Sequence, residues 1–233
     1  ALRDSLVLRL GRQDFENLSA KSPSIWRTLT VALARRVAEA NVSRPPPPDP
    51  RPRTVALIRA GSSALPAASV ERVLAAFDRT GKTILLTAAT AHEVLPPDTA
   101  LDSADATRAL NALEGRADTV LFLADEELTP WSEKAIRQAD LVLAVGWHAA
   151  AQRPNALERR AAELLPPDAQ RLVLLHAARA PIAGTSRWLA GRRIAMHHHV
   201  AVDTPGDFER LARFVHGTAL GLVACGGGAY CSA

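Results

Sequence analysis

The stretch "DTVLFLADEELTPWSEKAIRQADLVLAVGW", residues 118–147, holds two apolar runs separated by a more polar segment. The segments 118–125 and 141–147 each hold a continuous apolar run, as in strands whose two faces are both covered. The segment between them, "PWSEKAIRQ", is typical of a helix. The stretch therefore predicts a strand–helix–strand unit whose two strands are parallel, because a helical crossover joins parallel neighbours.

The same alternation continues on both sides of this stretch. Further strands are predicted at 54–60, 83–88 and 171–177, and helices at 67–79, from 88 to near 115, across "NALERRAAELL", across "TSRWLAG" and at 204–217. This order predicts an α/β fold, a doubly wound and mainly parallel sheet of Rossmann type, over residues 54–217.

Composition limits the classes of function. The chain has 233 residues, of which 48% are hydrophobic and 4% aromatic, so a globular protein with an aliphatic core is expected. Its net charge of +4 comes from arginines interleaved with acids, which favours a solvated surface over a nucleic-acid patch. Cys225 and Cys231 fit no zinc spacing. No apolar stretch approaches the roughly 20 residues that span a bilayer, and we expect a cytoplasmic location.

A proline-rich segment divides the chain. Six prolines fall within the eight positions 45–52, which favours a semi-rigid linker over 44–53, although a ligand of SH3 type remains an alternative. Residues 1–43 predict a strand and two helices, the second capped by Ser24 and running from Ile25 to about Glu39. One strand and two helices cannot enclose a core, so 1–43 is expected to be part of a larger module.

Two segments bear on phosphate binding. The string "AFDRTGKT", residues 76–83, meets a loose P-loop pattern, but a helix precedes it and a strand follows, the reverse of a working P-loop. Gly81 is therefore interpreted as a helix C-cap. The segment after the first strand, residues 60–66, has one glycine and no lysine.

Other candidates for chemistry are weaker. Residues 197–199 are three adjacent histidines, but alternate residues of an extended segment point to opposite sides, so a role in capping loops is favoured over a metal site. Residues 125–127 are interpreted as a loop at a strand end rather than an acid/base pair. Ser63 and Ser186 lack the glycines of a nucleophile elbow. We expect this chain to bind no cofactor and no metal.

The last residues suggest a different chemistry. An apolar strand at 220–225 enters Gly226, Gly227 and Gly228, and a glycine turn after a strand can present N–H groups to an oxyanion. A flexible tail is the alternative interpretation.

Two resemblances organise these observations. "DTVLFLAD" followed by "TPWSEKAIRQADLVLAV" resembles the Walker B strand and switch helix of ParA/MinD-type ATPases, which implies a degenerate nucleotide-binding fold because the loop lysine is absent. "TSRWLAGRRIAMHHHVAVDTPGDFERLARFVHGTALGLVACGGGA", residues 185–229, resembles the junction before the catalytic domain of bacterial patatin-like phospholipases of the neuropathy target esterase family.

That second resemblance implies a division of the chain. Residues 1–43 would be the C-terminal part of a cyclic-nucleotide-binding module, 44–53 a linker, 54–217 the middle α/β domain and 218–233 the start of the patatin domain. The glycines 226–228 would be vestiges of the oxyanion hole, although Tyr230 stands where the family motif has arginine. The catalytic Ser-Asp dyad would lie beyond residue 233.

The function implied is that of a regulatory or linker portion of a serine esterase acting on lysophospholipids, inactive by itself. Its partner would be a phospholipid or lysophospholipid, reached only through the patatin domain, with possible peripheral membrane contact and no nucleic acid. Two alternatives stay open, a non-enzymatic α/β binding or scaffold module and a ParA-like nucleotide-binding protein.

Overall fold

The computed structural model describes residues 11–22, 24–41, 51–97 and 99–220. The described residues fall into two compact units, a helical pair before residue 42 and an α/β domain from residue 51 onward. The predicted N-terminal strand, most of the proline-rich linker and the glycines 226–228 lie outside the described residues.

The first unit consists of α1 (Arg12–Lys21) and α2 (Ser24–Asn41). The helices touch where the ring of Phe15 meets that of Trp26 edge-on, with centroids 5.2 Å apart. Ser24 is the first residue of α2, not a cap before it, which corrects the predicted start by one position. Leu29 and Leu33 of α2 are exposed.

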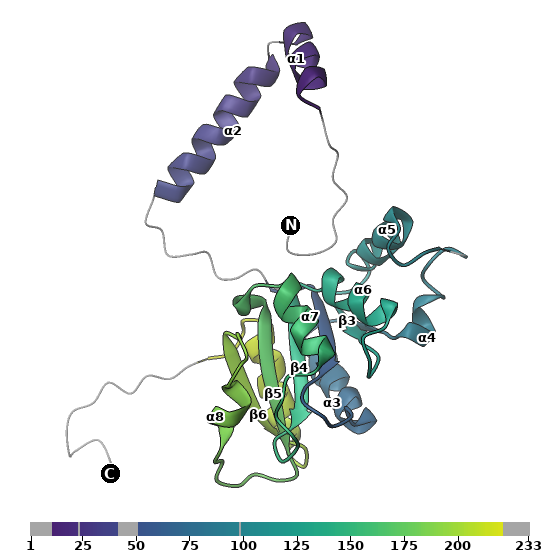
Figure 1. Cartoon of the computed structure of the whole chain (residues 1–233), viewed down its shortest axis with the longest axis vertical. Coiled ribbons are helices and arrows are strands. Elements are labelled where there is room, and N and C mark those ends of the chain that lie inside the picture. Colours follow the sequence, from purple (N-terminus) through teal and green to yellow (C-terminus); the bar gives the residue numbers. More distant parts are fainter. Residues whose placement is uncertain (1–10, 23, 42–50, 98, 221–233) are drawn as a thin grey trace, which may run out of the picture. The chain divides into compact units, whose positions relative to one another are not determined.

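The α/β domain is built on one sheet of six parallel strands in the order β2-β3-β1-β4-β5-β6 (Figure 1). The strands are β1 (Thr54–Arg59), β2 (Thr83–Leu86), β3 (Thr119–Leu123), β4 (Leu141–Trp147), β5 (Gln170–His176) and β6 (Met196–Ala201). The predicted doubly wound, parallel α/β fold is confirmed. The chain adds β2 and β3 on one side of β1 and β4 to β6 on the other, so its direction of growth reverses at β1.

Helices cover both faces of the sheet. They are α3 (Ala67–Asp78), α4 (Ala88–Ala91), α5 (Ala104–Leu113), α6 (Pro130–Gln138), α7 (Ala156–Leu164), α8 (Thr185–Leu189) and α9 (Pro205–Val215), with a 3-10 turn at Pro167–Ala169. The predicted single helical region between 88 and 115 is two helices, α4 and α5. Side-chain oxygens of Thr87, Ser103, Thr129 and Asn155 cap α4, α5, α6 and α7.

Alternate residues of each strand enter two separate cores. Ile58 of β1, Val142 of β4 and Leu172 of β5 pack under α4 to α8, in the core that includes the fully buried Trp188. Leu57 and Leu143, one position along, pack on the other face with residues of α3 and α9. Burial on both faces explains why the strands read as continuous apolar runs.

In the region 76–83 a helix comes before the glycine and a strand after it, which is the reverse of the order in a P-loop. Residues 76–78 end α3, and Thr83 begins β2. The backbone N–H of Lys82 donates to the Asp118 carboxylate at 2.9 Å, which holds the segment in a turn. The C-cap of α3 is Arg79 rather than the predicted Gly81, which lies two residues further on.

Candidate functional site at the carboxyl ends of the strands

The loop after β1 lies where the direction of sheet growth reverses, the position at which open α/β sheets bind ligands. Gly61 has φ +67°, and a Cβ there would lie 2.4 Å from the Ala151 carbonyl oxygen and 2.7 Å from the Trp188 ring. Its N–H donates to Oε2 of Glu158 at 2.9 Å. The next N–H, that of Ser62, donates to the same Ala151 carbonyl at 3.2 Å. Both amides are therefore already paired within the protein.

Glu158 reaches this loop from the first turn of α7. Asn155 caps that helix, and the two residues form a reciprocal capping box in which the Asn155 N–H donates to Glu158 Oε2 at 2.9 Å. The Asn155 amide also donates to the carbonyl oxygens of Arg59 and Gly61 at 2.9 and 3.1 Å. The start of α7 is thus tied to the end of β1.

Arg192 neutralises the buried carboxylate. Its Nε lies 2.6 Å from Glu158 Oε1 and its Nη2 lies 3.1 Å from Oε2, and the two side chains are only 4% and 6% exposed. Nη1 of Arg192 donates to the carbonyl oxygens of Gln152 and Trp188, both at 2.7 Å. The guanidinium also lies over the Trp188 ring, 4.9 Å from its centroid. The bidentate pair and these further bonds together give nearly every polar atom of the Glu158 and Arg192 side chains a hydrogen-bond partner.

This arrangement resembles an occupied anion site. Two backbone N–H groups and a guanidinium surround a carboxylate, which are the donors that otherwise hold phosphate at the start of a helix. Here the anion belongs to the chain itself. Incoming phosphate would have to displace Glu158 from a buried ion pair. The sequence predicted a loop without lysine, and the structure adds that the N–H groups of Gly61 and Ser62 in this loop are already paired.

Asp125, the Walker B-like residue, is also used locally. It follows β3, and its Oδ2 accepts the hydroxyl of Thr129 at 2.5 Å while its N–H donates to Ser132 Oγ at 3.0 Å. Glu127 pairs with Arg59 at 3.0 Å on the surface. The interpretation of residues 125–127 as a loop at a strand end is confirmed.

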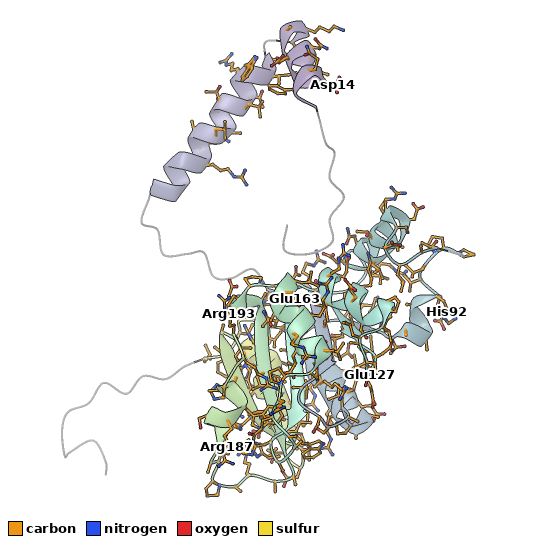
Figure 2. All side chains as sticks on the ribbon, viewed as in Figure 1. Asp14, His92, Glu127, Glu163, Arg187 and Arg193 are labelled. Atoms are coloured by element: carbon orange, nitrogen blue, oxygen red, sulfur yellow. The ribbon has the colours of Figure 1, made fainter. Side chains whose placement is uncertain are left out.

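A surface cavity of about 470 Å³ lies beside Asp125. Its walls come from α4, the segment after it and the start of α6, and include Leu95, Leu101 and Trp131. His92, next to α4 in Figure 2, also lines it. Apart from Asp125, His92 and two threonines the lining is apolar, and nothing in the described residues aims a second charge at its interior.

The three histidines at 197–199 belong to the edge strand β6, not to loop caps as predicted. His197 and His199 share one face, with ring centroids 5.5 Å apart. His198 faces the opposite side, against Phe214 of α9. The prediction that these three side chains point alternately to opposite sides is therefore confirmed, although β6 was not among the predicted strands.

Two further histidines join His199 at the carboxyl ends of β4 and β5. Nε2 of His176 lies 2.8 Å from Nδ1 of His199, and His148 stacks on His176 with centroids 4.7 Å apart. Thr185 Oγ1 lies 3.3 Å from the other nitrogen of His199. Sequence analysis missed His148 and His176, although each stands at a strand end, where parallel strands bring side chains together.

Burial lowers the pKa of two of these imidazoles. Desolvation, then the neighbouring His176, lowers the pKa of His199 from 6.5 to about 4. Desolvation, then His148, lowers the pKa of His176. Neutral imidazoles can share hydrogen bonds or ligate a metal. In the described part of the chain, however, no group of three or more His, Cys, Asp or Glu side chains is arranged to hold a metal ion.

Ser63 and Ser186, which the sequence does not favour as nucleophiles, lie in different parts of the chain. Ser63 Oγ accepts the N–H of Trp147 at 3.4 Å, and Ser186 is exposed in α8. Gly226, Gly227 and Gly228 lie outside the described residues, so their predicted role as vestigial oxyanion glycines stays a prediction. Within the ranges that the structure describes, no helix is long and apolar enough to cross a membrane.

The domain has P-loop-like α/β architecture. Its evidence is the strand order, the reversal of growth at β1 and the loop after β1, whose Gly61 and Ser62 amides are already paired. The model of the Neuropathy Target Esterase family P-loop like domain matches residues 52–205, and the chain belongs to that family. The predicted family resemblance is confirmed at this level.

Two relatives and one solved structure are similar to parts of this chain. The neuropathy target esterase sws of Drosophila virilis is 32% identical and that of Drosophila melanogaster 31%, each alignment covering 50% of this chain and 10% of the relative. The chain thus spans about a tenth of the length of these relatives. A crystal structure of the signal recognition particle 54 kDa protein from Aeropyrum pernix K1 in complex with GDP is 17% identical, with a TM-score of 0.42, covering 75% of this chain and 47% of that one.

Proposed function

We propose that this chain is a regulatory and linking portion of a patatin-like serine esterase, with no nucleotide or ester chemistry of its own. The observation that carries the proposal is the Glu158 carboxylate, which takes the N–H of Gly61 at 2.9 Å and pairs with the buried Arg192. A P-loop-like domain whose Gly61 and Ser62 amides are already paired, with the Glu158 carboxylate and the Ala151 carbonyl, serves as a folded body rather than as an NTPase.

Catalysis would come from polypeptide outside residues 1–233. There, an activated serine would attack the ester carbonyl of a phospholipid or lysophospholipid, with glycine amides holding the oxyanion. In this proposal residues 218–233, with the glycines 226–228, begin that catalytic domain and residues 1–43 end a cyclic-nucleotide-binding module. The whole protein would be cytoplasmic, touching the inner face of the membrane peripherally.

A nucleotide-binding protein of ParA type is the alternative that the site argues against. Magnesium nucleotide would need the N–H groups of residues 61 and 62, which are paired with Glu158 and Ala151. A scaffold without any attached enzyme is the other alternative, and it differs from the proposal only in what the coding sequence contains beyond residue 233.

Calorimetric titration of the 233-residue chain with ATP and with GDP, each with magnesium, tests the closed site. We expect no saturable heat at micromolar concentrations. Because displacement of Glu158 would be required, Glu158→Ala is the informative variant. Binding that appears only in Glu158→Ala would support the closed site, whereas saturable binding by the wild type would overturn the proposal in favour of a working nucleotide site.

The link to an esterase is tested on the natural coding sequence. We expect its frame to continue into a G-x-S-x-G nucleophile motif, and the full-length protein to hydrolyse a lysophospholipid in a reaction that a serine-directed phosphonate stops. The 233-residue chain should not hydrolyse p-nitrophenyl esters. A frame that ends without such a motif would support the scaffold alternative.

A further inference from the structure

A second, smaller cavity lies under α7 on the face of the sheet opposite α3 and α9. Its volume is about 130 Å³. Its floor is the sheet itself, formed by Ile58, Val142, Ala144 and Leu172, with Ala161 and Ile194 beside it. These floor residues belong to the apolar core, and Ala144 is small enough to leave space above β4. We call this space the α7 cavity.

The rim of the α7 cavity is basic. Arg159 of α7 and Arg193, which follows the buried pair, line it together with Arg192 and Glu158. Glu158 is the only acid in the lining, and Arg192 already neutralises it. Arg171 also contributes to the lining, but its guanidinium donates to the Phe214 carbonyl of α9 on the other face.

Neither Arg159 nor Arg193, the two arginines at the rim, forms an ion pair within the described residues. Arg159 uses one Nη to donate to the Pro154 carbonyl at 2.7 Å and is exposed. Among the residues that the structure describes, Arg193 is exposed and its guanidinium has no hydrogen bond or ion pair. The nearby acid Glu163 is already paired with Arg160 at 2.9 Å. Figure 2 shows Arg193 at the end of the domain opposite Arg187.

An apolar floor under unpaired guanidinium groups selects a ligand with two chemically different ends. Arginine forks bind carboxylate and phosphate, often through two parallel hydrogen bonds. An apolar cavity of about 150 Å³ holds a benzene ring, so the α7 cavity holds roughly four to six carbons. We propose that the α7 cavity binds a small anionic amphiphile, a carboxylate or phosphate monoester bearing a short alkyl group.

The ligand is a free short-chain molecule rather than a membrane lipid. With its head at the arginine rim, an acyl chain of membrane length would exceed the volume of the cavity. This inference does not depend on an esterase, because it follows from the lining alone, and its test uses no esterase readout. Failure of one proposal is therefore separate from failure of the other.

Titration calorimetry on the 233-residue chain tests the proposal with hexyl phosphate as the probe. Inorganic phosphate, 1-hexanol and dodecyl phosphate below its micelle concentration are the comparisons. We expect saturable binding of hexyl phosphate with one site per chain, and at least 10-fold weaker binding of each comparison. If inorganic phosphate binds as tightly as hexyl phosphate, the site is only a surface contact for anions. If dodecyl phosphate binds more tightly, the site is a surface for lipids. Either result overturns the proposal.

Substitutions locate the binding. Arg193→Gln should weaken hexyl phosphate about 10-fold, whereas Arg187→Gln, an exposed arginine of α8 that does not line the cavity, should leave it unchanged. Ala144→Leu should fill the floor and abolish binding. If Ala144→Leu does not fold by circular dichroism, Ala162→Leu at the exposed wall of α7 replaces it. Unchanged affinity in the folded cavity variant, or an equal loss in Arg187→Gln, would refute the assignment.

Discussion

The backbone N–H of Gly61 donates to the carboxylate of Glu158 at 2.9 Å, across 97 positions of sequence. This bond joins the loop after β1 to the first turn of α7 at the reversal point of the sheet. The carboxylate is buried, and Arg192 supplies the charge that makes its burial possible. The loop after the first strand, where other sheets of this type bind phosphate, therefore serves in this domain to hold β1 and α7 together.

Removing one member of this pair should destabilise the domain strongly. Glu158→Ala leaves Arg192 buried without its partner, and breaking a buried pair in this way costs about 3–5 kcal/mol. Urea unfolding followed by circular dichroism measures the loss. The double variant Glu158→Ala with Arg192→Met should recover part of it, because both charges are then gone.

Glu163→Ala is the matched control on the same helix. Glu163 pairs with Arg160 with its side chain 63% exposed, and surface pairs contribute about 0–1 kcal/mol. A Glu158→Ala loss no larger than that of the control would show that the buried pair does not stabilise the domain.

Gly61 should tolerate no side chain. At φ +67° a Cβ would lie 2.4 Å from a carbonyl oxygen, so Gly61→Ala combines backbone strain with a clash. We expect a loss of more than about 2 kcal/mol, from left-handed strain of roughly 1–2 kcal/mol plus the clash. Gly191→Ala, at φ +76° with no atom within 4 Å of its Cβ, isolates the strain alone. Thermal unfolding of both variants should rank Gly61→Ala as clearly the worse.

Mild acid should destabilise the domain through His198. Desolvation, then Arg171 and Arg210, lower the pKa of His198 from 6.5 to about 4. Above pH 6.5 the ring is neutral in both states and no penalty exists. As the pH falls from 6.5 to about 4, the unfolded chain takes up the proton first, and stability falls by about 1.4 kcal/mol per pH unit for this one group.

His198→Leu should flatten that dependence. The Nε2 of His198 is buried without a hydrogen-bond partner, so the substitution removes a titrating group and breaks no hydrogen bond at that atom. The ring contact with Phe214 is replaced by an apolar one. Urea midpoints at pH 7.5, 6, 5 and 4.5 measure the slope for both proteins. Parallel curves for wild type and His198→Leu would contradict the predicted linkage.

Stronger acid should act through Asp207. Its burial would raise its pKa, but the bonds from Arg179 and the Ala201 N–H, with the charge of Arg210, outweigh burial and hold the pKa below 3.8. Its stabilisation is therefore fully present above the unfolded value of 3.8 and is lost as the pH falls through the lower folded value. Asp207→Asn should lose stability at pH 7 and show a weaker further loss below pH 4 than wild type.

The C-terminal boundary can be tested by truncation. The last core residue of the described domain is Val215, and the N–H groups of Thr218 and Ala219 only close the end of α9 on the Arg213 carbonyl, at 2.9 and 3.1 Å. Deleting 218–233 should change the melting temperature by less than about 2 °C, because none of its described residues packs in either core. A drop of several degrees would place this segment inside the domain.

Most of the fold could be predicted because its signals are local. Apolar runs and caps lie within a few residues of one another, and they placed β1, β3, β4 and their helices to within two residues. β6 was missed because it is an edge strand whose histidines interrupt the apolar run. The start of α2 and the cap of α3 shifted by one or two residues, as expected at helix ends.

The sequence by itself determined the parallel α/β architecture, the absence of a lysine from the loop at 60–66 and the alternation of the three histidines. Only the tertiary structure decided that Glu158 closes that loop, that His148 and His176 meet His199, and that Arg159 and Arg193 share a rim. The physical reason is separation along the chain. Periodicity reports which face of an element is buried, whereas partners 23 to 97 positions apart, such as His176 with His199 or Gly61 with Glu158, are set by strand order and crossover geometry.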